Sequence, residues 1–208
     1  MAFIHLKNML VISFALLCIL GKSIAQQGRH NKRSTSQTTF RHDRENDYVN
    51  IGNRIFYRDK MVEGVDARSF KDLGNAYAID NWNAYYRGVK IKDVSPHSFQ
   101  SLGWGYAKDS WNAYYRGVKI KDVSAPSFKI LDEGYAKDSW NVYYRGNQIK
   151  NVSAQSFVLL GDGYSKDSWK VYYFGQEIKD ATAFTFKYLG KGYAKDNWNE
   201  YYRGKKLE

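Results

Sequence analysis

A tyrosine and an arginine recur two residues apart, and together they could bind carbohydrate or an acidic polymer. Tyrosine offers a flat apolar face with a polar tip, and arginine binds carboxylate or phosphate through two parallel hydrogen bonds. Repetition would strengthen weak single sites through multivalency. The alternative is cross-strand packing that only shields a sheet, and Phe174 replaces the arginine in one copy. The candidate ligand contacts are Tyr85, Arg87, Tyr114, Arg116, Tyr143, Arg145, Tyr201 and Arg203.

A row of tryptophans recurs with a constant step of 29 residues. Each lies two residues after an aspartate, as in Asp138-Ser139-Trp140-Asn141. A tryptophan in such a turn could be an exposed platform for a sugar ring, or it could pack over the neighbouring copy. We expect packing, in which case Trp140→Ala would cost roughly 3–5 kcal/mol. The row comprises Trp82, Trp111, Trp140, Trp169 and Trp198.

The aspartate before each tryptophan has two possible roles. Carboxylates bind Ca²⁺, but calcium takes about six to eight oxygen ligands and usually several carboxylates. Here each turn supplies one aspartate. Asp, Ser and Asn favour tight turns because they hydrogen-bond to their own backbone. We therefore predict turns and no metal site at Asp80, Asp109, Asp138, Asp167 and Asp196.

Catalytic combinations of residues are missing from the sequence. Beyond residue 25 the histidines are His30, His42 and His97, and none recurs at the repeat step. No Ser-His-Asp or Cys-His set can be argued from them. The glycines fall singly at turns rather than in a phosphate-binding loop. The sequence predicts a protein without catalytic residues, enzymatic activity or cofactors.

The recurring residues belong to a tandem repeat that begins at Tyr48. The first copy is degenerate, with Asn53 in place of tryptophan, as expected of a terminal capping unit. A repeat of this length cannot form a core alone, so neighbouring copies must share one. Tyrosine-to-arginine segments align six times without insertion, at residues 48–62, 77–91, 106–120, 135–149, 164–178 and 193–207.

Each copy is expected to be β structure with one short helical turn. Residues 135–138 and 141–145 read as two strands around the aspartate turn, and residues 128–131 as a third. Ser124 suits an N-cap and Pro126 suits the first turn of a helix.

Alternation along the second strand predicts which side chains enter the core. The position of Val142 is apolar in five of six copies, so Val142 and Tyr144 should face the core. Tyr143 and Arg145 would then face outward. Recurrent apolar residues complete the predicted core: Ile91, Ile120, Ile149 and Ile178; Val94, Val123 and Val152; Phe70, Phe99, Phe128, Phe157 and Phe186; Leu73, Leu102, Leu131, Leu160 and Leu189.

The fold class that follows is all-β. We predict an elongated array of tandem 29-residue hairpin or meander repeats, with three strands per copy. A closed small propeller is the alternative, although propeller blades typically have about four strands and more residues. An open array leaves sheet edges at its ends that could pair between chains.

The N-terminus has the features of a secretory signal peptide. Lys7 supplies a positive charge, residues 9–20 are apolar, and Ser23-Ile24-Ala25 gives a cleavage site before Gln26. We therefore expect residues 1–25 to be removed and the protein to be secreted, periplasmic or at the cell surface. The alternative is an uncleaved N-terminal anchor.

Cys18 is the one cysteine in the chain, and it lies in the expected signal peptide. Leu17 precedes it where a lipidation site requires a small residue, so lipidation is the less favoured alternative. Cleavage after Ala25 would leave no disulfide, thiol nucleophile or thiolate metal site.

Residues 26–47 are polar, with Phe40 as their one large apolar residue. Such a segment buries too little surface to offset the entropy of ordering, so we predict a disordered spacer before a repeat domain at residues 48–208.

The chain carries a net charge of +11, and residues 48–208, with 25 basic and 18 acidic residues, hold +7 of it. This charge permits attraction to an acidic glycan or envelope polymer, or to another protein. A solvated basic surface with no partner is the alternative. Export argues against a nucleic acid.

The segment Lys137-Asp138-Ser139-Trp140-Asn141-Val142-Tyr143-Tyr144 resembles the repeat of the DKNYY family, exported bacterial proteins named for an Asp-Lys-Asn-Tyr-Tyr type repeat. Phe128-Lys129-Ile130-Leu131 and Gly134-Tyr135-Ala136 also match, and the resemblance covers residues 48–208. Trp140 and Arg145 stand where the family pattern has polar residues. The resemblance implies an exported bacterial repeat protein and no particular activity.

These observations predict an exported, non-catalytic repeat protein that acts as a cell-envelope binding or scaffold module. The alternatives are a structural spacer and an accessory enzyme that acts on cell-wall glycans. The lack of a unique acidic pair outside the repeat pattern argues against the enzyme.

Overall fold

The computed structural model describes residues 48–208, which lie in one compact unit. The expected signal peptide (1–25) and spacer (26–47) lie outside the described residues. The described chain is all-β apart from two short 3₁₀ helices, η1 (Pro96–Ser98) and η2 (Ala125–Ser127). Within this part, no helix is long and apolar enough to cross a membrane.

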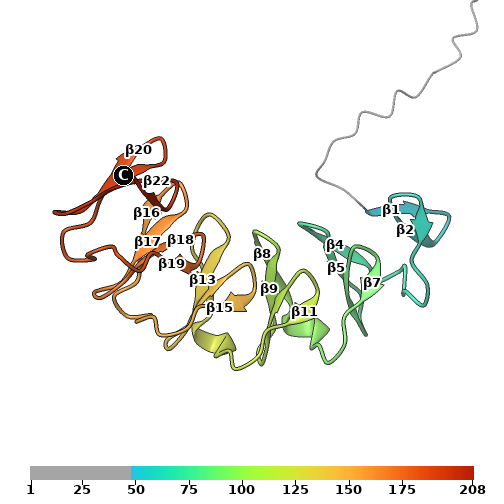
Figure 1. Cartoon of the computed structure of the whole chain (residues 1–208). Coiled ribbons are helices and arrows are strands. Elements are labelled where there is room, and N and C mark those ends of the chain that lie inside the picture. Colours follow the sequence, from blue (N-terminus) through green and yellow to red (C-terminus); the bar gives the residue numbers. More distant parts are fainter. Residues whose placement is uncertain (1–47) are drawn as a thin grey trace, which may run out of the picture. The chain divides into compact units, whose positions relative to one another are not determined.

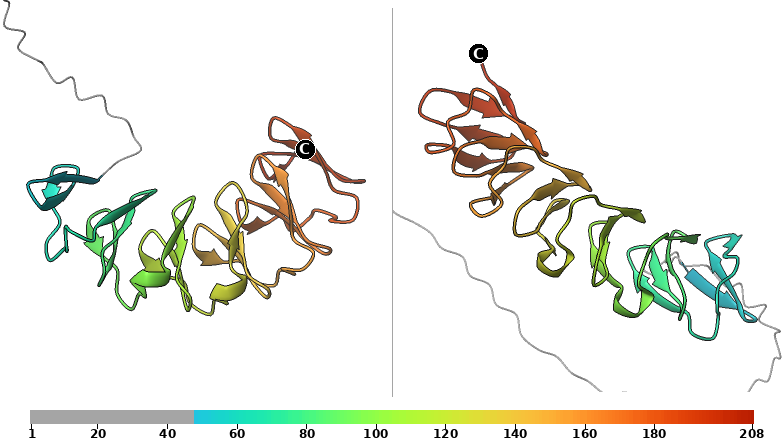
Figure 2. Two further views of the ribbon diagram at one scale, coloured as in Figure 1. Left: turned by 180° about the vertical axis from the view of Figure 1, so that it is seen from behind. Right: turned by 90° about the horizontal axis from the view of Figure 1, so that it is seen from below.

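The strands form six antiparallel sheets that follow one another in sequence order (Figure 1, Figure 2). Each sheet is a meander, because strands adjacent in sequence are adjacent in the sheet. Sheet 1 contains β1 (Tyr48–Ile51), β2 (Arg54–Tyr57) and β3 (Lys60–Met61); sheet 2 contains β4 (Lys71–Gly74), β5 (Tyr77–Ile79), β6 (Ala84–Tyr86) and β7 (Val89–Lys90); sheet 3 contains β8 (Gln100–Gly103), β9 (Tyr106–Lys108), β10 (Ala113–Tyr115) and β11 (Val118–Lys119). Sheet 4 contains β12 (Lys129–Ile130), β13 (Tyr135–Lys137), β14 (Val142–Tyr144) and β15 (Asn147–Gln148); sheet 5 contains β16 (Val158–Gly161), β17 (Tyr164–Lys166), β18 (Val171–Tyr173) and β19 (Gln176–Glu177); sheet 6 contains β20 (Lys187–Gly190), β21 (Tyr193–Lys195), β22 (Glu200–Tyr202) and β23 (Lys205–Lys206).

Sheets 2 to 6 have four strands rather than the three predicted. The additional strand, such as β15, has two residues and pairs with the strand before it across the Arg145-Gly146 turn. Two residues are too few for an alternating pattern to be recognised. The predicted helical turn is confirmed at η1 and η2. The side chain of Ser124 makes no capping hydrogen bond there, and its backbone N–H instead donates to Asp138.

Each inner sheet packs between its two neighbours. In sheet 4, Tyr135 and Val142 pack towards sheet 5, whereas Ala136 and Tyr143 pack towards sheet 3. Five buried clusters of this kind each join two consecutive sheets, and among the described residues none joins the first sheet to the last. The array is therefore an open row rather than a closed propeller.

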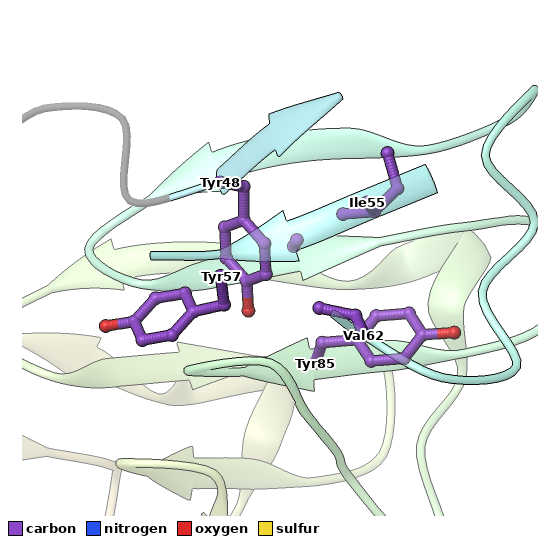
Figure 3. Close-up of a cluster of buried hydrophobic side chains, with 6 residues drawn as sticks. Tyr48, Ile55, Tyr57, Val62 and Tyr85 are labelled. Atoms are coloured by element: carbon purple, nitrogen blue, oxygen red, sulfur yellow. The ribbon is translucent and has the colours of Figure 1, made fainter. Parts of the chain in front are cut away.

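Figure 3 shows the first of these clusters. Tyr48, Ile55, Tyr57 and Val62 come from sheet 1 and the segment after it, and Tyr85 of sheet 2 lies against them. The ring of Phe70 packs on Tyr48 and Tyr85, with ring centroids 5.3 and 6.4 Å away. The recurrent phenylalanine thus fills the space between two sheets, as predicted for a core position.

In each of the first five sheets, a tyrosine hydroxyl forms hydrogen bonds with the backbone of the following copy. The hydroxyl of Tyr135 donates to the carbonyl of Gly163 (3.1 Å) and accepts from the N–H of Gly175 (2.8 Å), both in the following copy. Burial raises the pKa of Tyr135 to about 12, so the hydroxyl keeps its proton at neutral pH. The equivalent pair of bonds is made by Tyr48, Tyr77, Tyr106 and Tyr164.

Candidate functional site

The turns at the two ends of the strands form two edges of the array, and they are the regions where recurrent side chains reach solvent. Successive turns of a meander lie at opposite ends of its strands. The turn between the second and third strands of sheets 2 to 6 carries the tryptophan row, and we call this side the tryptophan edge. The next turn carries Arg58, Arg87, Arg116, Arg145, Phe174 or Arg203, and we call that side the arginine edge.

On the tryptophan edge, one carboxylate organises each turn. Oδ1 of Asp138 accepts the N–H groups of Trp140 (2.8 Å) and Asn141 (2.7 Å). Its Oδ2 accepts the N–H of Ser124 (2.9 Å) and the hydroxyl of Tyr143 (3.0 Å). Asp80, Asp109 and Asp196 make the equivalent four bonds. The prediction that these aspartates form turns is confirmed.

This network fixes the protonation states beneath the turn. Burial acts to raise the pKa of Asp138, but the hydrogen bonds from Ser124, Trp140, Asn141 and Tyr143 outweigh it, so the pKa is lowered. Burial and the neighbouring carboxylate raise the pKa of the Tyr143 hydroxyl. An ionised aspartate and a neutral tyrosine are therefore the stable pair. In the described part of the chain, no three His, Cys, Asp or Glu side chains lie close enough together to hold a metal ion.

The tryptophan side chains of this edge lie in solvent. Trp82, Trp111, Trp140, Trp169 and Trp198 are 74, 77, 78, 80 and 81 % exposed. The prediction that they pack over the neighbouring copy is wrong. The turn backbone is held by the carboxylate of the aspartate, which also accepts a hydrogen bond from the hydroxyl of the buried tyrosine. The indole is left to project outward.

The predicted tyrosine–arginine contact pairs are not formed. The first tyrosine of each pair is buried, and Tyr85, Tyr114, Tyr143 and Tyr201 are at most 1 % exposed. Their predicted outward placement is wrong because the alternation rule assumes one solvent face, whereas these sheets pack on both faces. The second tyrosine is half-buried, and the exposed arginine stacks on that ring. The guanidinium carbons of Arg87, Arg116, Arg145 and Arg203 lie 5.2–5.5 Å from the ring centroids of Tyr86, Tyr115, Tyr144 and Tyr202.

The arginine edge is built from close contacts between copies. Arg145 and Gly146 both have positive φ angles, of 47° and 80°. The N–H of Gly146 donates to the hydroxyl of Tyr106 in the preceding copy (2.9 Å). A Cβ atom at Gly146 would lie 2.6 Å from the Cβ of Tyr115. The turn is therefore a packing element, and its arginine serves to cover the tyrosine ring.

Grooves lie beside two of the exposed tryptophans, Trp140 and Trp82. One of about 710 Å³ is lined by Trp140 and Ser139, by Lys129 and Lys137, and by Gln155 of the connecting segment. Another, of about 440 Å³, lies against Trp82. Its polar lining is Asn83, Lys90, Lys92 and Asp93. A hollow of about 720 Å³ on the arginine edge lies where Phe174 replaces the arginine.

The exposure of the tryptophan row was not predicted, although the sequence contains a signal for it. Trp140 stands between Ser139 and Asn141, within a turn made by Asp138. A large apolar residue flanked by polar residues at a turn has no neighbouring apolar side chain of its own strand to pack with. The run Val142-Tyr143-Tyr144 has the opposite character, because continuous apolar residues indicate a strand buried on both faces.

A family model described as the DKNYY family matches residues 48–176. No curated protein matches the chain, and no solved structure does.

Proposed function

The chain belongs to the DKNYY family, and from this premise we propose that it is an exported, non-catalytic module that binds an extended polymer of the cell envelope. The binding surface in this proposal is the tryptophan edge. The tyrosines predicted as contacts, such as Tyr143, support that surface from below rather than touching the ligand.

One observation carries the proposal: five tryptophans, one per copy, are each at least 74 % exposed. Exposed large aromatic side chains that recur at one place mark interaction sites in soluble proteins. Sheets stacked face to face lie about 10 Å apart, so the row offers one indole per ~10 Å. That spacing is close to the length of a disaccharide in an extended chain, and the flat indole face suits the apolar face of a sugar ring.

Repetition also suits a polymer better than a small molecule. A single stacking contact contributes roughly 0.5–1.5 kcal/mol beyond the area it buries. One such contact is too weak for a useful affinity, but connected sites on one ligand raise avidity by about 10²–10⁴-fold. A ligand with repeating units is therefore the partner that uses all five side chains.

The chemistry of the turns supports a binding role over catalysis. The carboxylate of Asp138 accepts four hydrogen bonds and is held ionised. The Tyr143 hydroxyl is held neutral beside it. Both groups are occupied in positioning Trp140, so neither is poised to transfer a proton to a ligand. Export is supported by the signal-like residues 1–25, which lie outside the described residues.

The test is co-sedimentation of the purified protein with insoluble cell-envelope polysaccharide. The variant Trp111→Ala/Trp140→Ala/Trp169→Ala should bind at least about tenfold more weakly, a loss of ~1.4 kcal/mol. Trp104→Ala is the matched control, because Trp104 is 55 % exposed but lies in a turn on the arginine edge. Equal binding by the triple variant and the wild type would refute the proposal.

A structural spacer is the second candidate, and the tyrosine hydroxyl bonds between sheets favour it. Five such junctions tie the six sheets into a continuous row. A spacer, however, does not require exposed tryptophans. Binding that is absent in the wild type and in both variants would favour the spacer.

A further inference from the structure

Lysines lie on the tryptophan edge beside four of its five turns, and three of them extend towards the next copy. The residue three positions before the tryptophan is Lys108, Lys137, Lys166 or Lys195 in four of the five turns, and Ile79 in the first. The ammonium of Lys137 donates to the carbonyl of Ala154 (2.8 Å), and that of Lys166 to the carbonyl of Ala183 (2.8 Å). These lysines are therefore held in place at the junction between copies.

The charge of these ammonium groups is not neutralised by the protein. Lys108, Lys137 and Lys166 form no ion pair with any described residue. An ammonium has three donors, and the bond to Ala154 uses one of those on Lys137. The remaining donors are available to an anion that enters the groove.

The groove beside Trp140 places these cations next to the indole. Lys129 and Lys137 both line it, and the one carboxylate in its lining, Asp138, is buried and already accepts four hydrogen bonds. The groove beside Trp82 has the same character, with two lysines, Lys90 and Lys92, against one aspartate. Lysines therefore lie beside the indole at both Trp140 and Trp82.

We infer that the polymer bound at the tryptophan edge is an acidic polysaccharide, whose sugar rings stack on the tryptophans while its carboxylates pair with the lysines. This inference rests on the proposed function and specifies its ligand class. The grooves beside Trp140 and Trp82 have polar and charged linings, which fits a chain of alternating apolar faces and anionic groups better than a continuous apolar protein surface.

The distribution of lysines along the array predicts which copies bind the acidic ligand most strongly. The turns at Trp111, Trp140 and Trp169 each have the lysine three residues before and another ten residues after, at Lys121, Lys150 and Lys179. Trp82 lacks the first of these and Trp198 lacks the second, where Glu208 stands. The strongest binding should centre on sheets 3 to 5.

The experiment measures the affinity of the purified protein for polygalacturonate, for neutral dextran of similar length and for poly(dT), at low and high salt. We expect polygalacturonate to bind at least about tenfold more tightly than dextran at low salt, and this preference to shrink as salt screens the charges. The variant Lys108→Gln/Lys137→Gln/Lys166→Gln should lose most of the preference while its weaker dextran binding is unchanged.

Two further variants test whether the lysines act through their charge or through packing. Lys60→Gln/Lys191→Gln/Lys205→Gln removes the same charge from exposed lysines on the arginine edge and should bind like the wild type. Lys108→Arg/Lys137→Arg/Lys166→Arg keeps the charge and should retain the preference. If it also loses the preference, the lysines act through packing and the inference is overturned.

The possible outcomes test the acidic ligand class and the proposed function separately. If dextran binds as tightly as polygalacturonate and its binding depends on the tryptophans, the inference of an acidic ligand is overturned and the proposed function stands. Tighter binding of poly(dT) through the same lysines would assign the surface to nucleic acid and overturn the inference. If the triple tryptophan variant binds polysaccharide as tightly as the wild type does, both the inference and the proposed function are overturned.

Discussion

The tryptophan edge and the arginine edge repeat with the same 29-residue step, and both carry an aromatic side chain in every full copy. On the arginine edge the ring is covered: Tyr144 lies beneath Arg145 and against Gly175 of the next copy. On the tryptophan edge the ring is free, and Trp140 is 78 % exposed. The two edges show that strict repetition alone does not separate a packing residue from an exposed one.

The two edges differ in the groups that hold each turn in place. The Arg145-Gly146 turn is hydrogen-bonded and packed against side chains of the preceding copy. The turn of Trp140 is held mainly by the carboxylate of its own copy. The arginine edge therefore joins copies, whereas each turn of the tryptophan edge is organised by its own carboxylate and leaves its indole exposed.

The largest effect should follow from removing the carboxylate that organises the tryptophan edge. Asp138→Ala leaves three backbone N–H groups without their acceptor and deprives the buried Tyr143 hydroxyl of a partner. At about 1 kcal/mol per hydrogen bond, we expect a loss of roughly 4 kcal/mol, measured by urea unfolding. Exposed Asp180, which accepts through its backbone carbonyl, provides the control Asp180→Ala, with a loss below ~0.5 kcal/mol. Similar losses for both variants would mean that the turn does not depend on its carboxylate.

The next largest effect tests whether the arginine edge is a packing element. Gly146→Ala places a Cβ 2.6 Å from Tyr115 at a φ of +80°, so overpacking and backbone strain should together cost about 2–4 kcal/mol. Gly74→Ala is the matched control, since Gly74 has a φ of +74° and no atom within 4 Å of its Cβ position. Only the backbone cost of about 1 kcal/mol should remain there. Equal thermal stabilities of the two variants would contradict tight packing at this edge.

Lowering the pH should reduce the contribution of the tryptophan edge to the free energy of unfolding more than that of the arginine edge. In the folded protein the pKa of Asp138 lies below its ordinary value of 3.8, as do those of Asp80, Asp109 and Asp196. Their contribution to stability is fully present above about pH 4 and is lost as the pH falls through the folded-state pKa. Urea unfolding between neutral pH and about pH 2 should show this loss, and Asp138→Asn should show less of it than the wild type.

The smallest effect on stability should come from the tryptophan row itself. Trp140→Ala removes an exposed side chain and should change the free energy of unfolding by less than about 1 kcal/mol. Phe128→Ala, at a position 2 % exposed between two sheets, should cost roughly 3–5 kcal/mol. A loss of that size at Trp140 would show that the indole packs after all and would remove the contrast between the edges.

The sequence was sufficient to predict the repeat, the all-β array and most core positions in the connecting segments. The predicted core position Leu189 is wrong, because this side chain of β20 in the last sheet is 56 % exposed. Phe128 and Ile149 are buried as predicted, because their apolar character and regular step leave one interpretation.

On β14 the core placement of Val142 is confirmed, but the outward placement of Tyr143 is wrong. A three-residue strand offers too little alternation to show that both of its sides are covered. The exposure of Trp140 was missed because its polar neighbours Ser139 and Asn141 were interpreted only as turn formers, and not as a sign that the indole has no apolar partner on its own strand.

The junction made by the Tyr135 hydroxyl has a consequence for how such a chain can evolve. The carbonyl that accepts from the hydroxyl lies 28 residues further along the chain and the N–H that donates to it lies 40 residues further, and the same offsets recur at all five junctions. An in-frame duplication of 29 residues anywhere inside the array therefore creates a new junction with the same partners, without compensating substitutions. Unequal recombination between copies could lengthen or shorten the row one unit at a time, and each step would add or remove one tryptophan from the exposed edge.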